Sequence, residues 1–435
     1  MQFTRSNQFG VIAATLRQPI NAAAIKNLLL SKTVLTVIDQ AAFSASNFLT
    51  AVIVARHSSA EHFGLYILGL RLVDYCREMQ NVMIWSPYML FSPRFQDAAH
   101  ARYTGSTLAH QIFSCGLVAL IFLSAWLVLP PTFNSFMIPL ALVGVFFPLQ
   151  EYARRICFAN FHFVAVVMLD VAVTVIQLAG LYFCAIQNQM SVRNAYWIIG
   201  AANGIATLVW FVWARSFFIF DKSQFIPDFK MNWEQGKWLL GGNVTLLAAS
   251  QIFPWTLTTF HGAAATGVYA AGEGIVNFIR AFMISIQNFL GPKLAHAYAR
   301  GGKNALKQVV YQTTILLGVI TGACAALFAL FGGNLATLVY GEKFVGLRWV
   351  IAFLAVNIFL GALTTSQSYA LSTVERSDVN FKINILGLIL SMTLGIALTI
   401  QYGALGAALG LGVSNLLTAF VRQLVFARFF KQEVA

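Results

Sequence analysis

The chain has 435 residues, of which 58% are hydrophobic and only 10% are charged. Together with a mean hydropathy of +0.72, this composition excludes an ordinary soluble domain, in which about a quarter of the residues are charged. Runs of about 20 apolar residues recur along the chain, which is the length that crosses ~30 Å of hydrocarbon. The alternating pattern of a membrane β-barrel is missing, so we expect an all-α polytopic membrane protein.

The N-terminal segment, residues 1–32, precedes the first long apolar run. It carries four basic and no acidic residues, and Phe9, Ile12, Leu16 and Ile20 recur at near-helical spacing. This pattern predicts an amphipathic cytoplasmic segment that lies on the anionic inner leaflet. A cleaved signal peptide is disfavoured, because no compact apolar core with a small-residue cleavage site precedes residue 33.

Twelve membrane spans are expected along the rest of the chain, joined by short connections. They lie at 33–56, 63–92, 107–130, 134–153, 161–186, 194–214, 238–260, 265–291, 308–332, 346–372, 379–401 and 404–427. The longest connection is polar and basic, and it divides the chain into three parts. These are an N-lobe at 33–220, a cytoplasmic linker at 221–237 and a C-lobe at 238–430.

Basic residues are distributed very unevenly between the two sides of these spans. The side of the N-terminus holds 21 lysines and arginines, and the opposite side holds four. The positive-inside rule therefore predicts that both termini are cytoplasmic, in a bacterial inner membrane. Nucleic-acid binding is the poorer interpretation of the net charge of +13, because the basic residues are dispersed around helix ends rather than gathered in one patch.

Cysteine and histidine patterns give no indication of metal or redox chemistry. The five cysteines fall in apolar spans without CxxC spacing, and the seven histidines form no HExxH or HxH pattern. We therefore expect buried thiols, no metal site, no catalytic dyad and no bound cofactor.

An internal repeat becomes visible when the sequence is compared with itself at an offset of 203 residues. Residues 63–79 then align with 266–282, and five of the seventeen positions are identical, among them Gly64 with Gly267 and Arg77 with Arg280. The two segments belong to the second span of each half. Both halves start on the same side, so we expect two parallel six-helix lobes with a substrate cavity between them.

Polar stripes run along both of these matched spans. One stripe covers an arc of about 120° on the second span and consists of Arg71, Asp74, Arg77, Glu78 and Asn81. The stripe on the eighth span contains Glu273, Asn277 and Arg280. Because charges inside a membrane normally face a bundle interior or a watery cavity, we expect both stripes to line a central cavity and to bind substrate there.

Structural roles compete with this interpretation. Arg71 with Asp74, and Glu273 with Arg280, have the spacing to neutralise one another within a helix. Asp39 and Asp170 are isolated acids in the first and fifth spans, and each is either a proton or sodium site or a residue bonded to a neighbouring helix. Three arginines against five acids in the spans also argue against a simply cationic cavity.

Several segments resemble the polysaccharide-transporter branch of the MATE/MOP exporter superfamily, the Wzx-type flippases. They are ARHSSAEHFGLYILGL (55–70), PYMLFSPRF (87–95), GGNVTLLAASQ (241–251), ATGVYAAGEGI (265–275), GPKLAHAYARG (291–301) and YGALGAALG (402–410). The resemblance covers about residues 33–430 and implies a flippase that moves an undecaprenyl-diphosphate-linked oligosaccharide to the periplasmic leaflet. Glycosyltransferases and a polymerase of the same polysaccharide or lipopolysaccharide pathway would be its partners.

In this interpretation Arg77 and Arg280 grip the diphosphate, because the planar guanidinium binds phosphate oxygens in pairs. Asp39, Asp170 or Glu273 would carry the coupling ion, H⁺ or Na⁺. A MATE-type multidrug or cation antiporter is the alternative within transport. A membrane-embedded polymerase or ligase is the alternative from the enzymes, and it is disfavoured because no large loop is available to carry catalytic residues.

Overall fold

The computed structural model describes residues 32–344 and 346–431 of the chain. The amphipathic segment predicted before residue 32 therefore lies outside the described residues. Six helical stretches in these ranges are long and apolar enough, by composition, to cross a membrane. The protein is a multi-pass helical membrane protein.

The first half of the chain forms the N-lobe, whose helices alternate in direction. Its elements are α3 (Lys32–His57), α4 (Ala60–Gln80), η1 (Asn81–Trp85), α5 (Ser86–Phe91), η2 (Ser92–Arg94), α6 (Asp97–Val128), α7 (Pro131–Asn134), α8 (Met137–Ala159), α9 (Phe163–Ile186), α10 (Val192–Trp213) and η3 (Ala214–Phe217). Serine caps start two of these helices, because Ser59 accepts from the His62 amide and Ser191 from the Asn194 amide. The elements α4, η1 and α5 together make the second span.

The second half forms the C-lobe from fewer, longer helices. Its elements are α11 (Phe225–Tyr340), η4 (Glu342–Phe344), α12 (Arg348–Thr373), α13 (Ser377–Leu390), η5 (Ser391–Gly395) and α14 (Ile396–Lys431). Glycines with φ near +60° to +80° break these helices at Gly262, Gly302 and Gly403, where a side chain would strain the backbone. The breaks divide α11 into three spans and separate the last two spans, so the prediction of twelve spans is confirmed.

One predicted span boundary needs correction, and the expected linker is helical over most of its length. The fourth span was expected to end at residue 153, but α8 continues to Ala159, which places Arg154 inside the helix rather than in a basic loop. The linker was expected at 221–237, but α11 already begins at Phe225. Its first turns pack on the N-lobe, where Tyr103 donates a 2.8 Å hydrogen bond to Asn232.

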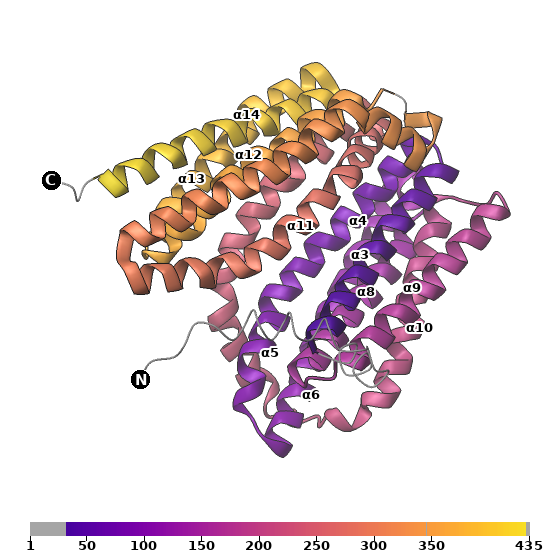
Figure 1. The fold of residues 1–435 in the computed structure, drawn as a ribbon. Coiled ribbons are helices and arrows are strands. Elements are labelled where there is room, and N and C mark those ends of the chain that lie inside the picture. The colour runs from indigo at the N-terminus through magenta and orange to yellow at the C-terminus, as the bar shows by residue number, and fades with distance from the viewer. Residues whose placement is uncertain (1–31, 345, 432–435) are drawn as a thin grey trace, which may run out of the picture.

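The two lobes meet at one end of the molecule and separate toward the other (Figure 1). At the first end a single buried core combines both lobes, from Phe63 and Tyr196 to Tyr269 and Ile351. At the other end the core splits into two: one has all its buried members within residues 84–214 and the other within 290–426. The closed end is the one opposite the basic loops, so the lobes separate on the side of those loops.

Candidate functional site

Backbone contact between α4 and α11 forms the centre of the closed end. A Cβ atom on Gly64 would lie 1.8 Å from the carbonyl oxygen of Ala263, and one on Gly267 would lie 2.2 Å from that of Ala60. The two glycines are partners in the 203-residue repeat and face each other across the lobe interface. Only glycine allows two helices to approach so closely, which explains why both copies of the repeat carry it.

An ion pair crosses the same interface further along these helices. The Arg71 guanidinium lies 2.8 Å from the Glu273 carboxylate, and the two side chains are 29% and 16% exposed. Neither of the pairings expected within a single helix, Arg71 with Asp74 or Glu273 with Arg280, is present among the described residues. The polar stripes therefore do meet between the lobes at this point, although as a salt bridge rather than as an open cavity.

Two basic side chains complete the closed end from the loops. Arg56 donates through Nε to the Val339 carbonyl at 2.6 Å and through a second nitrogen to Leu338. In return, Lys343 donates to the carbonyls of Arg56 and Ser58 at 3.2 and 3.1 Å. Each lobe thus caps backbone carbonyls of the other, and opening this end requires all of these contacts to break.

A buried ion cluster lies within the N-lobe, around Arg154 of α8. Its guanidinium lies 2.8 Å from Asp39 of α3, 2.7 Å from Glu151 of α8 and 3.0 Å from Asp170 of α9. The relative exposure of these four residues is 6% or less, and Gln150 donates a further 2.7 Å hydrogen bond to Asp170. Arg154 therefore faces three carboxylates in a region that water hardly reaches, and the more exposed Arg155 lies 3.8 Å from one of them, Glu151.

This cluster corrects the sequence interpretation in one respect. Asp39 and Asp170 were taken as isolated acids, but both contact the same arginine. The prediction missed Arg154 because the fourth span was ended one residue too early. The signal that was available is the i,i+3 spacing of Glu151 and Arg154 in an apolar stretch that continues to Ala159.

A cavity of about 280 Å³ lies beside the cluster in the N-lobe. Hydroxyl and amide side chains line much of it, namely Ser46, Asn47, Thr50, Thr174, Gln177 and Asn203, together with the carboxylates of Asp74 and Asp170. Arg77 also lines this cavity, but its charge is engaged. Its guanidinium lies 3.3 Å from Asp74 and 3.8 Å from Glu78, and it covers the ring of Phe147.

Asn81 is the last residue of the predicted stripe on the second span. It donates a 3.1 Å hydrogen bond to Glu78 and begins η1, a five-residue turn of π-helix. Such a wide turn in an otherwise α-helical span is frequent at functional sites. The acidic residues of the stripe are thereby held by neighbours on the same helix.

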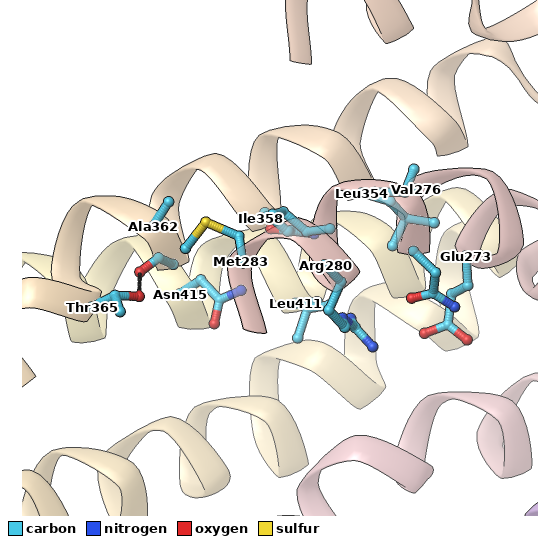
Figure 2. Close-up of a pocket in the computed structure, with 13 residues that line it drawn as sticks. Glu273, Val276, Arg280, Met283, Leu354, Ile358, Ala362, Thr365, Leu411 and Asn415 are labelled. Carbon is cyan, nitrogen blue, oxygen red and sulfur yellow. Dashed lines mark hydrogen bonds between the residues drawn. The ribbon is translucent and has the colours of Figure 1, made fainter. Parts of the chain in front are cut away.

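A second cavity, of about 270 Å³, lies within the C-lobe. Its polar lining comes from three helices: Glu273, Asn277 and Arg280 of α11, Asn357 and Thr365 of α12, and Asn415 of α14. Figure 2 shows Glu273, Arg280 and Asn415 pointing to the same side of the helices that carry them. Arg280 is exposed, and it has no carboxylate partner in the part of the chain that the structure describes.

Arg77 and Arg280, which the repeat relates, therefore line one cavity in each lobe. Each lies thirteen residues beyond the facing glycine of its own helix, at a depth of roughly 20 Å from the closed contact. Their electrostatic surroundings differ, since Arg77 is neutralised by two acids and Arg280 is not. Their binding of a substrate stays a prediction.

The sequence matches no protein-family model and no curated protein sequence. The fold, in contrast, is similar to solved transporter structures. An inward-facing multidrug resistance MATE family transporter of the MOP superfamily superposes with a TM-score of 0.72 at 12% identity, covering 90% of this chain and 96% of that one. The chain has the two-lobed MATE/MOP fold.

Two further structures refine this comparison. The lipid II flippase MurJ in an inward closed conformation has a TM-score of 0.66 at 11% identity, covering 90% of this chain and 87% of that one. An outward-facing multidrug resistance MATE transporter has a TM-score of 0.60 at 12% identity, covering 92% and 95%. Both structures share the overall fold of this chain.

Proposed function

We propose that the protein is a flippase that moves an undecaprenyl-diphosphate-linked oligosaccharide from the cytoplasmic to the periplasmic leaflet by alternating access. The observation that carries this proposal is Arg280, a guanidinium that has no carboxylate partner among the described residues. It lies in a C-lobe cavity whose other polar groups are largely amides. A diphosphate cannot cross hydrocarbon without donors that replace its water, and arginine binds phosphate oxygens in pairs. The lipid tail would stay in the bilayer during the transfer.

Movement of the substrate requires the two ends to open in turn. The closed end holds contacts that can break and re-form as units, namely the Gly64–Gly267 packing, the Arg71–Glu273 ion pair and the carbonyl caps of Arg56 and Lys343. Rocking of one lobe against the other about the cavities is the general mechanism of such two-lobed transporters. The similarity to a lipid II flippase supports a substrate of this class.

The buried cluster in the N-lobe is the proposed site of ion coupling. Three carboxylates contact the guanidiniums of Arg154 and, at the rim, Arg155, which leaves a surplus of one negative charge. Such a surplus is costly in a dry site unless a proton or Na⁺ neutralises it. Asp39 and Asp170 would take up this ion, and Glu273 would respond at the lobe interface. The partners of such a flippase in the inner membrane would be the glycosyltransferases and the polymerase of its polysaccharide pathway.

A MATE-type cation antiporter is the second candidate. The specific observation in its favour is the pair of carboxylates, Asp74 and Asp170, in the lining of the N-lobe cavity. The similarity to a multidrug resistance transporter adds to it. The enzyme alternative gains no support, since the similar structures are transporters and flippases.

Reconstitution separates these candidates. Vesicles would contain the purified protein and lipid-linked oligosaccharide extracted from the source cells, and impermeant periodate added outside would oxidise the sugars that arrive in the outer leaflet. We expect the wild-type protein to expose the sugars and Arg280→Gln to lower the initial rate at least tenfold, because the phosphate loses its charged donor. Arg193→Gln, an exposed arginine outside the cavities, is the matched control. Transport of ethidium without any sugar movement would establish the antiporter instead.

The same vesicles test the coupling site. Asp39→Asn and Asp170→Asn each keep the shape of the side chain and leave Arg154 with two carboxylates, so both variants should fold. We expect each to transport at a rate that no longer depends on an imposed proton or sodium gradient. An undiminished gradient dependence in both single variants and in the double variant would show that the cluster is structural.

A further inference from the structure

The polar groups that line the two cavities are of different chemical kinds, and several have no partner in the protein. In the N-lobe cavity, Ser46, Asn47 and Thr174 make no side-chain hydrogen bond to the described residues, although Ser46 is only 6% exposed. In the C-lobe cavity, Asn277, Arg280 and Asn415 make none. Polar side chains inside a protein are normally hydrogen-bonded, so each cavity has groups available for a ligand.

The N-lobe groups suit a neutral, hydroxyl-rich ligand. Serine, threonine and asparagine each offer a donor and an acceptor, which matches hydroxyl groups that also donate and accept. Two further amides leave their carbonyl oxygens available as acceptors. Gln177 donates through its NH₂ group to Thr50 at 2.6 Å, and Asn203 donates through its NH₂ group to the Ile199 carbonyl at 2.8 Å. Both carboxylates in the lining already contact an arginine, Asp74 contacting Arg77 and Asp170 contacting Arg154.

An organic cation fits this cavity less well than a sugar does. Three aromatic rings line the cavity, and the negative face of a ring attracts positive charge. The Tyr66 ring is only 2% exposed and stacks with the rings of Phe63 and Tyr196, which leaves Phe43 and Phe147 as the faces that would bind a cation. The Arg154 guanidinium lies 4.9 Å from the centre of the Phe43 ring, and that of Arg77 lies 5.3 Å from the centre of the Phe147 ring. Each ring thus already holds a cation that would repel a second one.

An anion is repelled from the N-lobe and attracted to the C-lobe. The N-lobe cluster and stripe contain more carboxylates than guanidiniums, whereas Arg280 contributes an unpaired positive charge and Glu273 is neutralised by Arg71. Asn277 and Asn415 supply neutral donors beside Arg280. Phosphate oxygens accept hydrogen bonds only, so a guanidinium with flanking amide NH₂ groups matches them.

We propose that one substrate occupies both cavities, with its diphosphate in the C-lobe cavity at Arg280 and its first sugars in the N-lobe cavity at Ser46, Asn47 and Thr174. This division rests on the proposed function and specifies how the substrate lies. The matched depths of Arg77 and Arg280 place the two cavities at one level of the membrane, so the sugar–phosphate bond lies across the boundary between the lobes. The N-lobe then binds the glycan, and the C-lobe binds the diphosphate of the common lipid carrier.

Photo-crosslinking in the source cells tests this arrangement with the native ligand. A benzophenone amino acid would replace Asn47 in one full-length variant, Asn415 in a second and the lipid-facing Leu120 in a control. After illumination and purification, mild acid cleaves the bond between the first sugar and the phosphate. We expect peptides around position 47 to keep a sugar mass and peptides around position 415 to keep a polyprenyl diphosphate mass, with neither at position 120.

Each other outcome overturns a defined part of the account. Sugar at position 415 with polyprenyl diphosphate at position 47, or the same fragment at both positions, contradicts the division but keeps a lipid-linked sugar as substrate. A small organic cation at position 47 contradicts the division and favours the antiporter. The absence of any glycolipid adduct at both positions, in variants that still reach the membrane, overturns the proposed function together with the division.

A binding measurement with defined probes gives a second, independent readout. The Ser46→Ala/Thr174→Val double variant removes two hydroxyls without changing charge or much volume. In nanodiscs we expect it to bind undecaprenyl-diphospho-N-acetylglucosamine at least fivefold more weakly than the wild type, while its affinity for undecaprenyl diphosphate stays within twofold. Equal loss for both probes, or no loss for either, contradicts a sugar subsite in the N-lobe.

Discussion

The two lobes share a backbone plan but not a charge distribution. The repeat preserves Gly64 and Gly267, whose contact holds the closed end together. The same offset places Leu354 opposite Glu151 and Asn357 opposite Arg154, so the C-lobe has an apolar residue and an amide where the N-lobe has its ion cluster. The two halves therefore share close helix packing. They differ in the charged and polar side chains that an ion or a substrate would meet.

Under the proposed function, this difference would give the two lobes separate tasks. The N-lobe concentrates buried carboxylates on α3, α8 and α9 around one arginine, an arrangement suited to taking up a coupling cation. In the C-lobe cavity, the Arg280 guanidinium lies among amides and has no carboxylate partner in the described residues, an arrangement suited to an anion. Two identical lobes would each carry the carboxylate cluster and the guanidinium. The coupling ion and the substrate anion would then have no separate binding sites.

Among changes that distinguish the two lobes, removal of Arg154 is expected to destabilise the protein most. Arg154→Gln would leave Asp39 and Asp170 buried without a cation and Glu151 with only the more distant Arg155, at 3.8 Å. Breaking a buried ion pair from one side costs about 3–5 kcal/mol. The equivalent C-lobe change, Asn357→Leu, removes a 2.9 Å hydrogen bond to the Ala408 carbonyl, at about 1–3 kcal/mol. Thermal unfolding in detergent would measure both, and equal destabilisation would show that the cluster is no more important than an ordinary buried amide.

A change at the shared glycine contact should alter conformation more than stability. In Gly64→Ala the new methyl group would collide with the Ala263 carbonyl, so the closed end should open and the outward-facing form should gain population. Spin labels at positions 61 and 342, which lie at this end, would report a longer distance. Gly116→Ala is the control, because a Cβ there meets nothing within 4 Å. An unchanged distance in Gly64→Ala would mean that the glycine contact does not hold the lobes closed.

The sequence predicts the parts of this structure that depend on local pattern. Apolar runs located the spans, and the repeated Gly64 and Gly267 marked the helices that form the lobe interface. Amphipathic spacing also identified Arg71 and Glu273 as interior residues. These features follow from periodicity and backbone sterics, which act over a few residues.

Contacts between helices that are distant in the sequence could not be predicted from local pattern. Arg71 has acids within reach on its own helix, and the sequence holds no sign that it prefers Glu273, which lies 202 residues away. Arg154 resembled a loop residue because Arg155 follows it directly in a basic pair. Its three carboxylate partners come from three helices, and only their packing shows that it is buried.

Binding of undecaprenyl diphosphate to three forms of the protein tests the central claim that the anion belongs to the C-lobe. The wild type, Arg77→Gln and Arg280→Gln would be compared in nanodiscs at one salt concentration. A charge-assisted hydrogen bond contributes about 1.5–3 kcal/mol, so Arg280→Gln should weaken binding about tenfold or more. Arg77→Gln should change the affinity less than threefold, because Asp74 and Glu78 already neutralise that side chain. An equal or larger loss in Arg77→Gln would contradict the account.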